Sequence, residues 1–278
     1  MLAGGVEGNA AMWAGTSQGF GGAGSEQVSR QVGGERAPVL CPEGREQRVL
    51  FIGNSYTHYF EMPRLLAAMA ASAGCQLEVD YVAPGGSRLK MHAQSGQTLS
   101  AIGRTDWDAV VLQNFSQLPS QPLSRVARES LPHVKQLVDA ILNNNPDTSI
   151  HYYVTWGRRD GDKKNCANNP VVCTFEGHTE ALHRGYGFYA EKLGGSLVDV
   201  GGAWARIKRD ASAAFPHRRL YDKDGSHPSL RGSYLAASVF FAALFGHSPQ
   251  GLSYPDGLSP RAARYIQSIA STVPVSGA

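Results

Sequence analysis

One apolar segment stops abruptly at a serine, and this feature constrains the fold more than any other in the chain. Residues 49–53 read Val-Leu-Phe-Ile-Gly and are followed at once by Asn54 and Ser55. A short apolar run without polar alternation is typical of a strand buried on both faces of a parallel sheet. We therefore expect Ser55 to lie at the rim of such a sheet. Asn and Ser are also common helix caps, so this tripeptide alone favours no particular chemistry.

Similar apolar segments alternate with amphipathic segments from Arg48 onward. This alternation is typical of βαβ units, in which helices cover a parallel sheet. We predict an α/β fold with five parallel strands. The expected strands are 49–53, 77–82, 109–113, 150–156 and 196–200, and the expected helices are 60–73, 123–144, 177–193, 229–245 and 260–272.

The first 46 residues have a different composition from the rest of the chain. They are rich in Gly, Ser, Ala and Gln and hold few large aliphatic residues, so they cannot bury enough apolar surface to offset the entropy of ordering. We predict a flexible, disordered leader over residues 1–46 and a single domain over residues 47–278. The leader has neither the basic region nor the apolar core of a secretory signal.

Composition excludes two classes of partner. A formal net charge of +3, from 26 basic and 23 acidic side chains without a long basic run, gives no surface suited to nucleic acid. The longest apolar stretch, residues 234–245, is shorter than the roughly 20 residues that span a bilayer, so we expect no membrane span.

The four cysteines suggest one disulfide. Cys166 and Cys173 close a short loop whose Asn-Asn-Pro turn at residues 168–170 can bring the two sulfurs together. The alternative is a pair of free thiols, as in a reducing cytosol, whereas a disulfide favours an extracytoplasmic location. Cys41 and Cys75 lack the paired spacing of a zinc site, and we expect no metal.

Asp224 and His227 could activate the serine. A hydroxyl is a poor nucleophile at neutral pH unless a base takes its proton, and an imidazole oriented by a carboxylate is such a base. Asp224 precedes His227 by three residues, so the carboxylate can reach back to the ring, and Ser55 completes a Ser-His-Asp triad. The alternative is an Asp-Gly turn with a surface histidine.

Three groups are candidates for stabilising an oxyanion. They are the backbone N–H of Ser55, the backbone N–H of Gly86 and the side-chain amide of Asn114, each of which follows an expected strand. Strand alternation points Gln113 to the opposite face from Asn114, which favours Asn114 as the donor. A plain tight turn also explains Gly85 and Gly86, and an Asn at a strand end is ordinary.

Candidate substrate-binding residues lie beside these groups. Tyr56 adjoins the serine and could line a pocket, Trp156 could stack on an acyl group or sugar, and Arg158 or Arg159 could bind an acidic or polyhydroxyl substrate. Packing of the aromatic side chains against the sheet and a solvated charged loop are the alternatives.

Taken in order, these elements resemble the SGNH (GDSL-like) hydrolases. The matching elements are Gly53-Asn54-Ser55, Gly86, Asn114 and Asp224-x-x-His227, and the resemblance covers roughly residues 48–250. It implies a three-layer α/β/α sandwich of flavodoxin-like type and an acyl-enzyme mechanism without a cofactor. The chain looks like a subgroup with Gly-Asn-Ser in place of Gly-Asp-Ser. The third element also lacks the usual Gly-x-Asn-Asp.

The resemblance implies a serine esterase of carboxylesterase or acetylesterase type that removes a small acyl group, for example acetyl from a carbohydrate. Ser55 would be the nucleophile, His227 the general base and Asp224 the residue that orients it. The expected partner is a small-molecule or carbohydrate ester. An O-acyltransferase that uses the same site and a non-catalytic carbohydrate-binding module are the alternatives.

Overall fold

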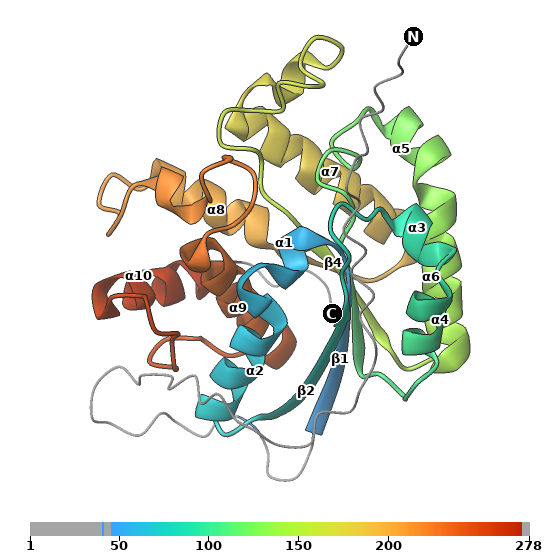
Figure 1. Cartoon of the computed structure of the whole chain (residues 1–278), viewed down its shortest axis with the longest axis horizontal. Helices are drawn as coiled ribbons and strands as arrows, with labels where there is room; N and C mark the ends of the chain where they lie inside the picture. Colours follow the sequence, from blue (N-terminus) through green and yellow to red (C-terminus); the bar gives the residue numbers. More distant parts are fainter. Residues whose placement is uncertain (1–40, 42–45, 274–278) are drawn as a thin grey trace, which may run out of the picture.

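Five parallel strands form one sheet at the centre of the molecule (Figure 1). The computed structural model describes residue 41 and residues 46–273. The strand order is β2-β1-β3-β4-β5, and the predicted α/β class with a five-stranded parallel sheet is confirmed. The strands are β1 (Glu46–Ile52), β2 (Gln76–Val82), β3 (Ala109–Leu112), β4 (Ser149–Val154) and β5 (Ser196–Asp199).

Helices cover both faces of this sheet. They are α1 (Ser55–His58), α2 (Met62–Ser72), α3 (Leu89–Ala93), α4 (Gly96–Ile102), α5 (Leu123–Glu129), α6 (Leu131–Asn144), α7 (Phe175–Leu193), α8 (Val200–Arg209), α9 (Leu230–Phe245) and α10 (Pro260–Ala270). Three short 3₁₀ turns, η1 (Tyr59–Glu61), η2 (Pro170–Cys173) and η3 (His217–Leu220), lie between them.

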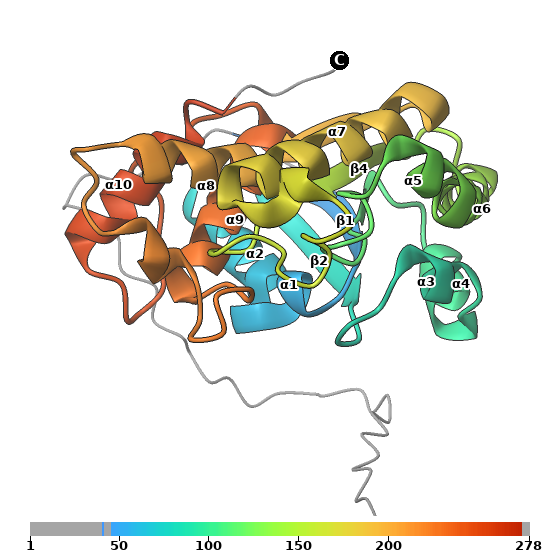
Figure 2. The ribbon, with the colours of Figure 1, turned by 90° about the horizontal axis from the view of Figure 1, so that it is seen from above.

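The alternation of β1 residues separates two cores. Val49 and Phe51 pack against α2, α8, α9 and α10, while Leu50 and Ile52 pack against residues of α3, α4, α6 and α7. All four side chains are fully buried, which is why the segment reads as continuously apolar. Figures 1 and 2 show the sheet between these two helical layers. The molecule is therefore a three-layer α/β/α sandwich.

The helix predicted over residues 123–144 is two helices. α5 ends and α6 begins at Ser130, whose backbone leaves helical geometry (φ −126°, ψ −48°). Pro132 lacks the N–H that a continuous helix would need at this point. The break turns the Ser130 hydroxyl inward, where it shares a 2.6 Å hydrogen bond with Tyr189.

The sequence analysis did not predict four helices that the structure contains, α1, α3, α4 and α8. α3 and α4 are short, and α8 begins where the strand predicted over residues 196–200 was expected to end. Asp199 caps α8 by accepting a hydrogen bond from Gly202 N–H at 2.8 Å. The adjacent Gly201 and Gly202 weaken the helical pattern of the sequence, because glycine has a low helix propensity.

Two disulfides join the described cysteines. Cys166 pairs with Cys173, and Cys41 pairs with Cys75 across 34 positions of the chain. The sequence analysis did not anticipate the second pair.

The leader predicted for residues 1–46 lies outside the described residues, except for Cys41 and Glu46. No helix within residues 46–273 is long and apolar enough to cross a membrane.

Candidate active site

The serine lies at the carboxyl end of β1, where α1 begins. Asn54 caps this helix, because its Oδ1 accepts a hydrogen bond from Tyr56 N–H at 3.1 Å. Gly53 allows the close packing that precedes the cap. A Cβ at that position would lie 2.3 Å from Thr57 Oγ1 and 2.7 Å from Gln113 Oε1, so no larger residue fits without displacing them.

Two buried amides hold the loop that carries Ser55 in place. Gln113 Oε1 accepts hydrogen bonds from Asn54 N–H at 2.9 Å and from the Thr57 hydroxyl at 3.0 Å. Asn54 Nδ2 donates to the carbonyl oxygen of Ser87 at 3.0 Å. The loop after β1 is thereby fixed both to the end of β3 and to the loop after β2.

Ser55, His227 and Asp224 lie in contact in the folded chain. The Ser55 hydroxyl is 2.9 Å from His227 Nε2, and His227 Nδ1 is 2.5 Å from Asp224 Oδ2. A carboxylate only accepts hydrogen bonds, so Nδ1 carries the ring proton and Nε2 is free to accept one from the serine. Backbone N–H groups of Ser226 and His227 donate to Asp224 Oδ1 at 2.9 and 3.0 Å and fix the carboxylate.

The environment of Asp224 favours its charged form. Burial raises the pKa of this carboxyl, but the hydrogen bonds from the His227 ring and from the two backbone N–H groups outweigh burial, so its pKa lies below the ordinary value. The Tyr59 ring stacks on the His227 ring with centroids 4.5 Å apart, and Tyr56 meets it edge-on at 5.6 Å. These rings restrict the imidazole to one orientation.

The loop that carries Asp224 and His227 is anchored to the end of β4. Arg159 N–H donates to the Gly225 carbonyl at 2.9 Å, and Trp156 Nε1 donates to the Ser226 carbonyl at 3.0 Å. Two strand ends distant in sequence, those of β1 and β4, therefore set the position of the serine relative to the histidine.

Trp156 is not the open stacking platform that the sequence analysis predicted. Its side chain is 0% exposed and is stacked between Tyr56, at 4.7 Å, and Trp204, at 4.0 Å. Tyr56 is also buried beneath the serine, and its hydroxyl shares a 2.6 Å hydrogen bond with Ser226. Burial raises the Tyr56 pKa, although hydrogen bonds to Ser226 and Ser116 oppose it. The rings of Tyr56 and Trp156 therefore pack inside the protein next to the site and support it.

Gly86 lies in a tight turn beside the serine. Ser87 N–H donates to the Pro84 carbonyl at 3.2 Å, and Gly86 has a φ of +72°, which L-residues with a side chain rarely adopt. A Cβ on Gly86 would meet nothing within 4 Å, so the backbone conformation requires glycine here, not a lack of space. The described residues supply no acceptor for the backbone N–H groups of Gly86 and Ser55.

The prediction of Asn114 as an oxyanion donor is wrong. Asn114 is fully buried, and its Nδ2 donates to Ser130 at 2.8 Å and to Tyr189 at 3.1 Å. Its Oδ1 accepts hydrogen bonds from Leu89 N–H at 3.2 Å and Phe115 N–H at 2.8 Å. The side chain therefore joins two loops, and no donor is left over for a substrate.

Two buried histidines that the sequence analysis did not single out join other loops of the site. His92 Nε2 donates to the Gly53 carbonyl at 2.7 Å. His178 Nε2 donates to the Ser116 carbonyl at 3.3 Å, while its Nδ1 accepts from Arg158 N–H at 3.2 Å. Burial lowers the pKa of His92 and lowers that of His178 to about 4, so both rings are neutral at pH 7.

Burial raises the Tyr56 pKa, and the positive charge of Arg158, the predicted substrate-binding residue, opposes that rise. The Arg158 side chain is half-buried, and its Nε has no hydrogen-bond partner within the described residues. No carboxylate among the described residues forms an ion pair with this guanidinium.

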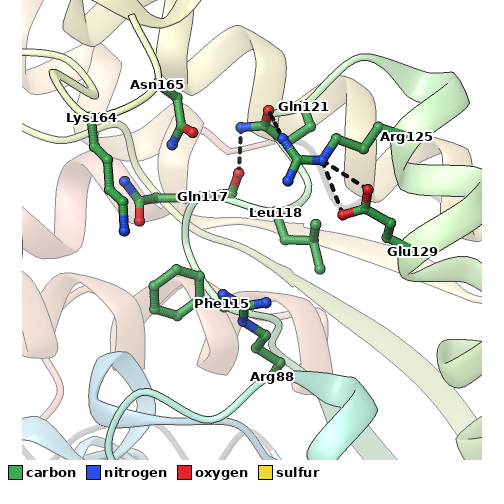
Figure 3. A pocket seen from close by; sticks show the side chains of 9 residues that line it. All are labelled: Arg88, Phe115, Gln117, Leu118, Gln121, Arg125, Glu129, Lys164 and Asn165. Carbon is green, nitrogen blue, oxygen red and sulfur yellow. Dashed lines mark hydrogen bonds and ion pairs between the residues drawn. The ribbon is translucent and has the colours of Figure 1, made fainter. Parts of the chain in front are cut away.

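A pocket opens at the same edge of the sheet, between the loops that follow β2, β3 and β4 (Figure 3). Its volume is about 170 Å³. Polar side chains dominate its wall, and only two lining residues are apolar. The lining residues are Arg88, Phe115, Gln117, Leu118, Gln121, Arg125, Glu129, Lys164 and Asn165.

Solved structures with this arrangement of strands and helices include proteins described as hydrolases. A DUF4886 family protein from Bacteroides uniformis superposes with a TM-score of 0.70 at 18% identity, over 82% of this chain and 94% of that chain. A candidate SGNH hydrolase from Slackia heliotrinireducens gives 0.56 at 27% identity, over 72% of this chain and all of that chain. The lipase/acylhydrolase from Enterococcus faecalis gives 0.52 at 12% identity, over 76% and 100%.

The chain has the SGNH-hydrolase fold. No protein-family model and no curated protein sequence matches it. The structural likeness therefore supports the superfamily that the sequence resembles, and the Gly-Asn-Ser subgroup stays a prediction.

Asn54→Asp should destabilise the protein at neutral pH. The introduced carboxylate can still cap α1, but it cannot donate to the Ser87 carbonyl, and an unpaired buried acceptor costs about 1–3 kcal/mol. Its burial against a carbonyl should raise its pKa, and the protonated form could donate. We expect the loss of unfolding free energy, relative to wild type in urea titrations, to be larger at pH 7 than at pH 5.

Asn54→Ala is the control, because it loses the hydrogen bond to the Ser87 carbonyl, together with the cap of α1, without adding a titratable group. Its deficit should be the same at both pH values. A deficit for Asn54→Asp that does not change with pH would contradict the role assigned to Asn54 Nδ2.

Stability should fall in mild acid. Burial lowers the pKa of His92 and brings those of His151, His178 and His217 to about 4 in the folded state. The unfolded chain takes up these protons near pH 6.5, so their contribution is fully present above that value and is lost as the pH falls towards 4. We expect the free energy of unfolding to decrease by about 1.4 kcal/mol per pH unit for each of His151, His178 and His217.

Urea titrations between pH 7.5 and 4.5 measure this slope. His178→Gln should be less stable than wild type at pH 7.5 but should show a shallower slope below pH 6.5, because one of the titrating groups is gone. An identical slope in both proteins would show that His178 is not held neutral by the fold.

Proposed function

We propose that the protein is a serine ester hydrolase of carboxylesterase or acetylesterase type that removes a small acyl group from an ester. The observation that carries this proposal is the contact of the Ser55 hydroxyl with His227 Nε2 at 2.9 Å, with the opposite ring nitrogen on Asp224. The SGNH-hydrolase fold and the likeness to the candidate hydrolase at 27% identity support it.

In this mechanism Ser55 Oγ attacks the ester carbonyl while His227 Nε2 takes the hydroxyl proton. Asp224 holds the ring in the required tautomer and stabilises the imidazolium that forms. The backbone N–H groups of Ser55 and Gly86 donate to the oxyanion of the tetrahedral intermediate. His227 returns its proton to the leaving alcohol, and a water molecule activated by the same ring then releases the acyl group from Ser55.

The polar wall of the pocket supports a hydroxyl-rich alcohol, such as a carbohydrate, as the leaving group. Gln117, Gln121 and Asn165 offer amide groups there, and Phe115 and Leu118 are its only apolar lining residues. A lipid alcohol would instead need a mostly apolar surface.

Product analysis with and without an acceptor sugar distinguishes hydrolysis from acyl transfer.

Ser55→Ala should abolish turnover of 4-nitrophenyl acetate, because no other hydroxyl contacts His227 Nε2 among the described residues. The measurements are initial rates, labelling by a fluorophosphonate probe and a thermal melt that shows the fold is intact. Wild-type protein should be labelled at Ser55 and the variant should not. Unchanged turnover in a folded variant would remove the nucleophile assignment.

Asp224→Asn should lower kcat on the order of 10⁴-fold while the protein stays folded. The introduced NH₂ group would face His227 Nδ1 and favour the tautomer that carries its proton on Nε2, which cannot accept one from Ser55. Asp222→Asn changes a nearby exposed carboxylate in the same loop and should keep wild-type activity. Equal activity of the two variants would exclude an orienting role for Asp224.

A further inference from the structure

The pocket between the loops that follow β2, β3 and β4 carries positive charge that its single lining carboxylate does not balance. Arg88, Arg125 and Lys164 line it together with a single carboxylate, that of Glu129. Glu129 already binds Arg125 Nε at 3.0 Å and Arg128 Nη2 at 3.2 Å, as Figure 3 shows for Arg125. Within residues 46–273, no carboxylate forms an ion pair with Arg88 or Lys164.

The wall that carries Arg88 is fixed in place. The Arg88 guanidinium lies 5.3 Å from the centroid of the Phe115 ring, within the range of a cation–π interaction. Asn114 Oδ1 binds the backbone N–H groups of Leu89 and Phe115 and so joins the two loops behind this pair. The buried side chain of Asn114, which cannot serve as an oxyanion donor, therefore helps to shape the pocket.

The opposite wall is built on a buried carboxylate. Asp162 is fully buried and accepts hydrogen bonds from Gln117 Nε2 and Asn165 Nδ2, both at 2.6 Å. Because a carboxylate only accepts, each amide turns its nitrogen to Asp162 and leaves its oxygen for another partner. Neither amide oxygen accepts a hydrogen bond from a described residue, and the Cys166–Cys173 disulfide closes the segment that follows.

The pocket is coupled to the nucleophile at both walls. Ser87, which precedes Arg88, accepts the hydrogen bond from Asn54 Nδ2 next to Ser55. Ser116, which follows Phe115, is near enough to the Tyr56 hydroxyl to oppose the rise that burial causes in its pKa. Arg88 and Phe115, which line the pocket, are therefore the sequence neighbours of residues that contact the loop of the triad serine.

We propose that this pocket binds a hydroxylated, carboxylate-bearing part of the ester substrate. Arg88 and Lys164 pair with the carboxylate, and the amide oxygens of Gln117 and Asn165 accept hydrogen bonds from its hydroxyl groups. A guanidinium presents parallel N–H groups that match the two oxygens of a carboxylate, and such charge-assisted bonds are the stronger ones. The inference rests on the proposed esterase function for the reaction, although not for the binding itself.

The kinetic test compares mono-O-acetylated glucuronic acid with mono-O-acetylated glucose. Wild-type kcat/KM should be at least tenfold higher for the acidic ester, and added salt should reduce this ratio because it screens exposed charges. In Arg88→Gln and in Lys164→Gln the ratio should fall about tenfold. Lys163→Gln removes the neighbouring exposed lysine, which does not line the pocket, and should keep the wild-type ratio.

A binding test separates failure of this inference from failure of the proposed function. Calorimetry on the Ser55→Ala protein should show glucuronate binding about tenfold more tightly than glucose, and Lys164→Gln should remove the difference. Such binding without turnover by wild type would overturn the esterase and keep the subsite. Turnover with equal ratios in wild type, Arg88→Gln and Lys164→Gln, or equal binding of the two sugars, would overturn the subsite.

Discussion

The site depends on how closely the loop that carries Ser55 packs against the end of β3. The hydrogen bond from Asn54 N–H to Gln113 Oε1, with an N···O distance of 2.9 Å, joins the two segments. Only a glycine at position 53 leaves room for this close approach. The position of Ser55 relative to the end of the strand is therefore fixed, and its hydroxyl contacts His227 from that position. Preorganisation of this kind allows a short serine side chain to act without local rearrangement.

Uncharged buried side chains connect the remaining loops. His92, His178, Gln113 and Asn114 each bind backbone groups of the segments that follow β1, β3 or β4. A neutral imidazole can donate at one nitrogen and accept at the other, so it can join two loops without burying a charge. Burial maintains that neutrality by lowering the histidine pKa, so the connections hold at neutral pH and weaken in acid.

The sequence predicted the layers and the order of the reactive groups because both follow local rules. Apolar runs such as 49–52 mark strands buried on both faces, and the carboxyl ends of parallel strands gather at one edge of the sheet. Ser55, Asp224 and His227 could be selected from their residue types and their places after a strand or before a helix. The fold then had to bring residues about 170 positions apart into contact.

Other parts of the site could not be read in this way. Strand alternation was used to choose Asn114 over Gln113, but β3 ends at Leu112 and alternation does not apply beyond it. The burial of Trp156 depends on Trp204, which stacks on it. Trp204 lies on α8, which was not predicted because its two glycines weaken the helical pattern of the sequence. The pairing of Cys41 with Cys75 likewise depends on tertiary distance, which residue spacing does not reveal.

The amide in Gly-Asn-Ser has a physical role that a carboxylate could not fill. Asn54 accepts a hydrogen bond from Tyr56 N–H with one atom and donates to the Ser87 carbonyl with the other, and the residue is almost completely buried. A carboxylate could make the first contact but would face the Ser87 carbonyl with a second acceptor. The amide thus joins the turn that contains Gly86 to the loop that carries Ser55 and adds no charge beside that serine.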